Sequence, residues 1–198
     1  PYLGHLPPKS DVTISADPDL PDGVETIVST AFAGSVEGRS RAEFLAELVS
    51  LQDSIVVAGA HGKTTTAAMI AFVLDRLGRD PGFLIGAEVP QLGSNARAGA
   101  GWLVVEGDES DRTIELLRPK LAVITNVDLD HHTEFSSTAE LEERFDAWAA
   151  AIGDGRVVWG RDVERVELER AVPGLHNRID AACALAALEL AGFERAAA

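Results

Sequence analysis

The sequence predicts an α/β protein of the P-loop type, with a mostly parallel sheet covered by helices on both faces. An apolar run at 54–57 is followed by a glycine-containing turn and then by a helix pattern over 64–77. Two further apolar runs, 102–105 and 121–125, lack the polar alternation of a strand with one wet face. Uniformly apolar strands are typical of parallel sheets, and strands that alternate with helices favour this class of fold.

The residues before this core predict a small N-terminal α/β segment. Residues 12–15 and 25–30 have the composition of short strands. Ser40 is a good capping residue for a helix over 41–49, whose apolar residues repeat on one face.

The residues after the core continue the alternation of helix and strand. We expect an amphipathic helix over 138–151, a strand over 156–159 and an alanine-rich helix over 179–190. The single cysteine, Cys183, falls in the last helix, where burial is the expected role.

Composition narrows the classes of function. The 198 residues carry a formal net charge of −15, which argues against a nucleic-acid surface. No apolar run reaches the roughly 18 residues of a membrane span, and no signal-peptide pattern opens the chain. We therefore expect a cytoplasmic protein with neither nucleic acid nor membrane as partner. The oligomeric state stays open.

The turn at 58–66 reads Ala-Gly-Ala-His-Gly-Lys-Thr-Thr-Thr and predicts a phosphate-binding loop. Gly59 and Gly62 would let backbone N–H groups approach phosphate oxygens, and the following helix N-terminus favours an anion. Lys63 would reach the β- and γ-phosphates, and Thr64 would offer its hydroxyl to Mg2+.

The spacing of this loop differs from the general G-x-x-x-x-G-K-[ST] motif. Val57 occupies the position of the first glycine, and the chain has the shorter G-x-x-G-K-T-T from Gly59 to Thr65. The alternative is an ordinary glycine turn before a helix. The Lys-Thr-Thr-Thr run directly after an apolar strand favours phosphate binding.

Polar residues follow the two later strands, at 106–111 and 126–132. Because ligands bind beyond the carboxyl ends of parallel strands, Glu106 is a candidate Mg2+ ligand. The other acidic residues of 106–111 fit a metal site or a solvated turn equally well. His131 and His132 could be surface residues or metal ligands, and no second Cys/His cluster supports zinc.

Several motifs in a fixed order resemble the Mur ligases of peptidoglycan synthesis. The motifs are Gly59–Thr66, Phe83–Gly86, Gly93–Arg97, Glu106–Asp111, Thr125–Asn126 with Asp130–His131, and Gly174–Asn177. Each motif alone is weak, but the ordered set, covering roughly residues 25–192, is specific.

The resemblance implies an ATP-dependent enzyme that joins a carboxylate to an amine. In this family ATP phosphorylates the carboxylate, and the amine then attacks the acyl phosphate. The subgroup that this chain most resembles adds L-alanine to UDP-N-acetylmuramate. The implied partners are thus a nucleotide-sugar carboxylate and an amino acid, and the implied cofactors are ATP and Mg2+.

The resemblance also implies roles for single residues. Lys63, Glu106 and His131 would be catalytic, with Thr64 and Glu106 holding one metal ion and His131 a second. The implied ATP-binding residues are Gly59, His61, Gly62, Lys63, Thr64, Thr65, Asn126, His176 and Asn177. The last two would lie on the adenine side.

The resemblance further divides the chain into two parts. Residues 1–50 would be a remnant of a UDP-binding domain and residues 51–198 the ATP-binding middle domain, with the C-terminal ligase domain absent. The 198 residues alone are then expected to be inactive as a ligase.

Two residues depart from the family pattern. Asp180 replaces an asparagine near adenine, and Thr133 replaces an acidic residue after the Asp-His pair. A ligase-like protein that binds ATP and Mg2+ without ligase activity is therefore the alternative. An ordinary P-loop phosphotransferase is a third hypothesis, which the loop spacing and the His176–Asn177 segment disfavour.

Overall fold

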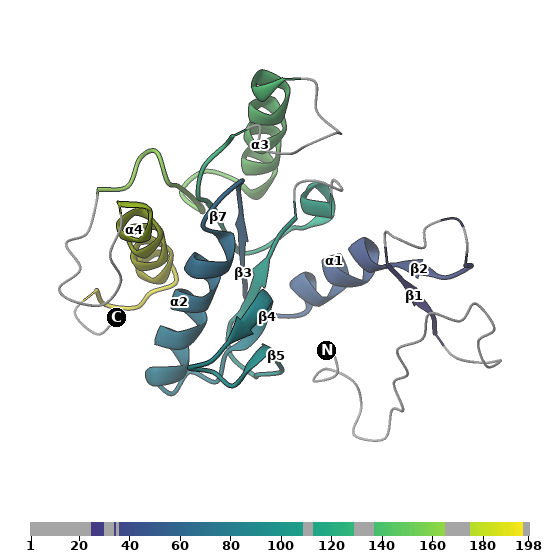
Figure 1. Ribbon diagram of the computed structural model, residues 1–198, viewed down its shortest axis with the longest axis horizontal. Helices are drawn as coiled ribbons and strands as arrows, with labels where there is room; N and C mark the ends of the chain where they lie inside the picture. Colours follow the sequence, from purple (N-terminus) through teal and green to yellow (C-terminus); the bar gives the residue numbers. More distant parts are fainter. Residues whose placement is uncertain are drawn as a thin grey trace.

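The computed structural model describes residues 25–29, 34, 36–108, 113–128, 137–164 and 175–195, and its centre is a six-stranded sheet (Figure 1). The strands are β3 (Ser54–Ala58), β4 (Gly82–Val89), β5 (Ser94–Arg97), β6 (Leu103–Glu106), β7 (Leu121–Ile124) and β8 (Val157–Trp159). Their order is β5-β4-β6-β3-β7-β8, and all neighbours are parallel except β4 and β5. The predicted mostly parallel sheet is confirmed, and β3 lies at its centre.

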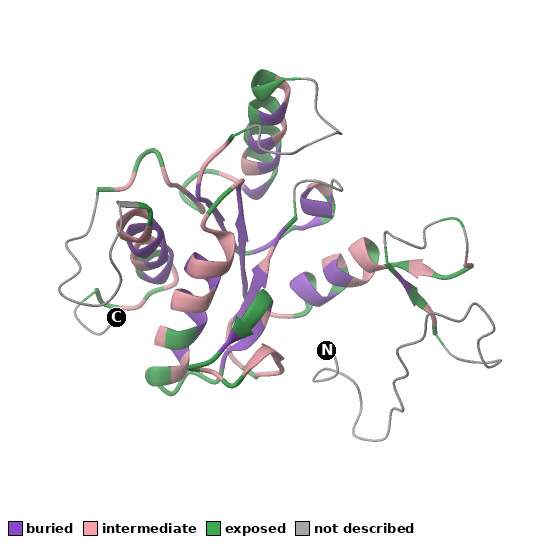
Figure 2. Ribbon diagram, in the orientation of Figure 1, coloured by how far each residue is buried: buried purple, intermediate pink, exposed green. Residues whose placement is uncertain are grey.

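Helices cover both faces of this sheet. They are α1 (Arg41–Leu51), α2 (Lys63–Arg76), α3 (Thr138–Ile152) and α4 (Leu175–Leu190), with a short 3-10 helix, η3 (Thr113–Leu116). One core cluster joins α2 and α4 to the sheet, and a second joins α1, α3 and η3 to the opposite face. Figure 2 shows buried residues on the sides of these helices that face the sheet.

Strand β3 contributes side chains to both core clusters, which explains its uniformly apolar run from Ile55 to Ala58. Ile55 and Val57 pack in the cluster under α2 and α4, whereas Val56 and Ala58 pack in the cluster under α1 and α3. Successive side chains of a strand point to opposite faces, so a strand covered on both sides needs apolar residues at every position.

The N-terminal segment consists of a two-stranded parallel pair and α1. The strands are β1 (Ile27–Val28) and β2 (Arg39–Ser40). Ser40 caps α1 as predicted, since its hydroxyl accepts from the Glu43 N–H at 3.2 Å, and the Glu43 carboxylate accepts from the Ser40 N–H at 3.0 Å. This reciprocal pair satisfies two backbone donors at the start of the helix.

Several predicted boundaries need correction. The strand expected at 25–30 is only two residues long, and the strand expected at 12–15 lies outside the described residues. The last helix begins at Leu175 rather than at 179. The polar run His176-Asn177-Arg178 breaks the alanine-rich pattern, but polar residues fit the first turn of a helix, where backbone donors are unpaired.

The antiparallel pair of β4 and β5 was not predicted. Strand β4 reads Gly-Phe-Leu-Ile-Gly-Ala-Glu-Val and mixes buried and exposed positions without strict alternation. The short partner β5 reads Ser-Asn-Ala-Arg and has no buried residue. Neither segment has the period-2 pattern that identifies a half-buried strand.

Candidate functional site

The loop at 59–62 connects β3 to α2 and lies at the carboxyl end of the central strand. Gly59 and Gly62 have φ values of +123° and +83°. A Cβ atom at Gly59 would approach the Asn126 carbonyl oxygen to 2.6 Å, so the backbone of the loop packs directly against the residues after β7. Glycine is required there both for the backbone conformation and for this close approach.

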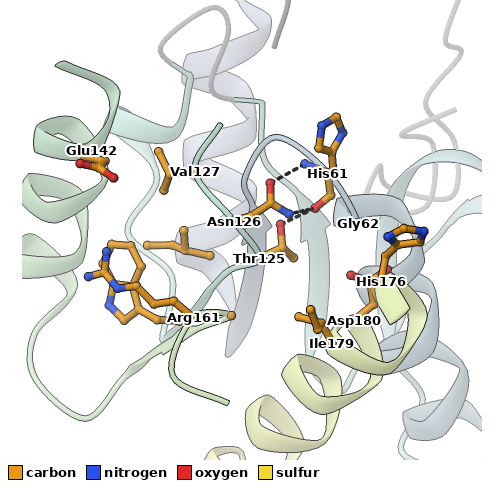
Figure 3. Close-up of a pocket in the computed structure, with 13 residues that line it drawn as sticks. His61, Gly62, Thr125, Asn126, Val127, Glu142, Arg161, His176, Ile179 and Asp180 are labelled. Atoms are coloured by element: carbon orange, nitrogen blue, oxygen red, sulfur yellow. Dashed lines mark hydrogen bonds between the residues drawn. The ribbon is translucent and has the colours of Figure 1, made fainter. Parts of the chain in front are cut away.

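Thr125 and Asn126 hold the loop in place (Figure 3). The Asn126 side chain accepts from the His61 N–H at 2.9 Å and donates to the His61 carbonyl at 2.8 Å. The Thr125 hydroxyl donates to the same carbonyl at 2.6 Å. Asn126 therefore holds the backbone of the loop in position. Thr125 does the same, although the sequence motifs assigned it no role.

Lys63 and Thr64 open helix α2. The Lys63 ammonium donates to the Gly59 carbonyl at 2.7 Å, so it curls back over the loop. The Thr64 hydroxyl lies 3.0 Å from both carboxylate oxygens of Glu106. A hydroxyl and a carboxylate at this separation are oxygen donors of the kind that Mg2+ prefers.

Glu106 reaches Thr64 because β6 pairs with β3 in parallel, with Glu106 opposite Val57. It is the last residue of β6, whereas the sequence placed it just after the strand. Its carboxylate also accepts from the Gly86 N–H at 2.7 Å. A Cβ at Gly86 would come within 2.8 Å of that carboxylate, so a glycine of the unpredicted strand β4 makes room for it.

His131 lies outside the described residues, as do Asp130 and Thr133. The structure therefore brings together Lys63, Thr64 and Glu106 but does not describe the proposed second metal ligand. In the part of the chain that it does describe, no three His, Cys, Asp or Glu side chains gather as a metal cluster.

A cavity of about 420 Å³ adjoins the loop (Figure 3). Its walls come from the loop, the end of β7, helix α3, the end of β8 and the first turns of α4. The lining residues are His61, Gly62, Ile124, Thr125, Asn126, Val127, Glu142, Trp159, Gly160, Arg161, His176, Ile179 and Asp180.

The predicted residues of this region have different surroundings. His61 and His176 line the cavity, whereas their neighbour Asn177 in α4 is not among its lining residues. Thr65 is half-buried in the first turn of α2. Arg161, which sequence reasoning did not single out, stacks over the Trp159 ring at 4.0 Å, so a planar cation and an indole share one wall.

Asp180 is the buried carboxyl group of this cavity, with 5% of its surface exposed. A Cβ at Gly62 would come within 2.9 Å of its carboxyl carbon, so the side chain lies against the backbone of the glycine loop. Burial raises the pKa of Asp180 to about 6, and the charge of His176 opposes that shift.

The comparisons with known proteins agree on one protein family. The family model for the Mur ligase middle domain matches residues 57–170, more than half of the chain. A UDP-N-acetylmuramate–L-alanine ligase from Syntrophobacter fumaroxidans is 49% identical over 113 residues, 57% of this chain and 24% of that protein. The ligase of the same name from Dinoroseobacter shibae is 45% identical over 126 residues, 63% of this chain and 27% of that protein.

Solved structures show the same fold. A UDP-N-acetylmuramate:L-alanyl-gamma-D-glutamyl-meso-diaminopimelate ligase from Neisseria meningitides has a TM-score of 0.69 at 24% identity, covering 81% of this chain and 68% of that one. A UDP-N-acetylmuramate-alanine ligase from Thermotoga maritima has a TM-score of 0.68 at 22% identity, covering 86% of this chain and 52% of that one.

The match to curated relatives covers about a quarter of their length. No helix in the described ranges has the length and apolar character to cross a membrane. The family match over more than half of the chain, together with the sheet order and the loop at the end of β3, assigns this chain to the Mur ligase family, through its middle domain.

Proposed function

We propose that this chain is the ATP-binding part of an ATP-dependent carboxylate–amine ligase that adds L-alanine to UDP-N-acetylmuramate. The observation that carries the proposal is the contact of the Thr64 hydroxyl with the Glu106 carboxylate, directly after the glycine loop. The substrates are those in the printed names of the curated relatives. By the same likeness, residues 1–50 would belong to a preceding UDP-binding domain and residues 51–198 to the middle domain.

The loop residues suit a triphosphate. Backbone N–H groups at the start of α2 have no partner within the helix and carry a partial positive charge. Lys63 is already bound to a loop carbonyl at 2.7 Å, and a phosphate oxygen would compete for the same ammonium. Because the chain is acidic overall, this local positive charge is needed to admit an anionic nucleotide.

Thr64 and Glu106 would hold Mg2+, with one hydroxyl and one carboxylate oxygen. Bound there, the ion would offset negative charge as a carboxylate approaches the triphosphate. Glu106 is kept in position by the Gly86 N–H, which satisfies one of its oxygens independently of the metal. The cavity that begins at Gly62 would take the nucleoside.

The test is calorimetric titration of the chain with ATP and Mg2+. We expect binding that requires Mg2+ and that Lys63→Ala weakens by roughly 2–5 kcal/mol, the range for losing one partner of a desolvated charge pair. Lys120→Ala is the matched control. Lys120 lies at the amino end of β7, away from the loop at the carboxyl ends of the strands, and it pairs with Asp53 at 2.6 Å.

The two variants should separate a binding role from a general change of charge. Lys120→Ala should bind ATP as the unchanged protein does. If both variants and the unchanged protein bound equally well, or if none bound, the loop would be structural and the proposal would be wrong.

A further inference from the structure

The peptide group between His61 and Gly62 is held from one side by the residues after β7. Its carbonyl accepts from the Thr125 hydroxyl at 2.6 Å and from the Asn126 amide at 2.8 Å, as Figure 3 shows. The Thr125 hydroxyl also lies 3.2 Å from the Ala58 carbonyl, but it has only one proton, and the contact with His61 is the shorter one. Two donors thus fix the direction of the His61 carbonyl.

The direction of this carbonyl decides the direction of the next N–H group. The peptide bond is planar and trans, so the Gly62 N–H points away from the two side chains that hold the His61 carbonyl. Gly62 is the N-cap of α2, and its N–H is one of the donors without a partner inside the helix. The N–H groups of Ala60 and His61 already donate to Asn126, at 3.2 and 2.9 Å. Gly62 therefore supplies the loop N–H whose direction depends on the contact with Thr125.

The Thr125 hydroxyl can direct this peptide because Thr125 is itself held firmly. Its N–H donates to the Ala58 carbonyl at 2.9 Å, at the end of the central strand. A Cβ at Gly160 would overlap the Thr125 carbonyl, so the chain after β8 packs against the backbone of this residue. Thr125 is 3% exposed, and a Cβ at Gly59 would overlap its hydroxyl. A buried β-branched side chain with these neighbours has little rotamer freedom.

We propose that Thr125 is a positioning residue for the nucleotide: by holding the His61 carbonyl, it presets the Gly62 N–H for a phosphate group at the start of α2. This inference rests on the proposed nucleotide binding. A donor that is already in place needs no reordering when the ligand binds, and the saved cost appears as affinity. Asn126 contacts the same carbonyl, so loss of the Thr125 hydroxyl weakens binding without abolishing it.

The experiment compares the Mg·ATP dissociation constants of the unchanged chain and of three variants by calorimetric titration. Thr125→Val keeps the shape of the side chain and removes the hydroxyl, whereas Thr125→Ser keeps the hydroxyl. Ser54→Ala is the matched control. Ser54 is buried, its hydroxyl donates to the Val49 carbonyl at 2.8 Å, and it begins β3 at the end opposite to the loop. Urea unfolding shows that each variant is folded and measures its loss of stability.

We expect Thr125→Val to weaken Mg·ATP binding about five- to tenfold, the effect of one hydrogen bond, and Thr125→Ser to restore most of that loss. Ser54→Ala should lose a similar free energy of unfolding, because it also removes one buried hydrogen bond from a hydroxyl to a carbonyl. Its Mg·ATP binding should equal that of the unchanged chain. A role of Thr125 in stability alone would change the unfolding curve and leave the dissociation constant unchanged.

A measurement on the unchanged chain keeps the test independent of whether the variants fold. In the free chain, the order parameter of the Gly62 N–H from nitrogen-15 relaxation should be that of rigid backbone, about 0.85. Addition of Mg·ATP should then shift the Gly62 N–H resonance. An order parameter below about 0.6 in the free chain would show that the peptide is mobile and would overturn the inference.

Two results of the titration separate the inference from the proposed function. If the unchanged chain binds Mg·ATP and Thr125→Val binds it equally well, or if Ser54→Ala is weakened to the same degree, Thr125 does not position the loop and the proposed function stands. If the unchanged chain binds no Mg·ATP, the inference and the proposed function fail together.

Discussion

Asp180 imposes a pH-dependent cost on folding. Its pKa is about 6 in the folded protein, above the ordinary 3.8, because burial disfavours the charged form. Between these values the folded state keeps a proton that the unfolded state releases, so the free energy of unfolding falls as pH rises from about 4 to about 6. Above pH 6 the full cost is present, and below pH 4 it disappears.

Asp180→Asn should therefore stabilise the protein at pH 8 by roughly 2–3 kcal/mol, since each pKa unit is worth about 1.4 kcal/mol. The gain should be smaller by about 1 kcal/mol at pH 5. Urea unfolding at the two pH values measures it. Asp53→Asn is the control, because Asp53 is 55% exposed and its ion pair should contribute little at either pH. An equal gain at both pH values would contradict the burial argument.

At the scale of single residues, the sequence predicted which residues lie at the site but not all of the contacts that surround them. Thr64 follows β3 through the glycine loop and Glu106 ends β6, so their meeting at the carboxyl end of the sheet was predictable from parallel topology. The contact of Thr125 with the loop and the burial of Asp180 depend on how β7 and α4 pack against it. Such packing has no local signal in the sequence.

At the scale of elements, the loop between β3 and α2 depends on a glycine that no other residue can replace. Gly59→Ala would place a Cβ against the side chain of Thr125 and the carbonyl of Asn126, at a φ of +123°. We expect this substitution to lower the free energy of unfolding by about 2–4 kcal/mol, from backbone strain and overpacking together.

Gly93→Ala is the matched control for that prediction. Gly93 also has a positive φ, +70°, but a Cβ there would meet nothing within 4 Å. It should cost only about 1 kcal/mol, the strain of the backbone conformation. Chemical denaturation of both variants gives the difference, and equal losses would show that the close approach of Gly59 to Thr125 and Asn126 is unimportant.

Elements with a strong pattern were predicted to within a few residues, and those without one were missed. Helix α1 has a capping serine, and β3 has an uninterrupted apolar run, so both were found. The pair β4 and β5 lies at the sheet edge, where side chains are partly exposed and the pattern is weak. Its role at the site, through Gly86 and Glu106, follows only from tertiary structure.

At the scale of the whole molecule, the six-stranded sheet would provide the proposed nucleotide site, whereas ligation needs further parts of a protein. An acyl phosphate must be shielded from water, and the attacking amine must be held near it. The matched relatives are about four times longer than the region they share with this chain. We expect the amine site and the closing surface to lie in that additional length.

A polypeptide limited to these 198 residues should therefore bind ATP and Mg2+ but form no amide bond from UDP-N-acetylmuramate and L-alanine. Incorporation of radiolabelled L-alanine measures bond formation, and calorimetry on the same sample confirms that the nucleotide site is intact. Slow ATP hydrolysis is compatible with the proposal, because Lys63 lies over the glycine loop and Thr64 of α2 contacts Glu106 of β6. Amide formation at an ordinary enzymatic rate would show that the sheet and its two layers of helices suffice for the reaction, and the division of labour between domains would have to be abandoned.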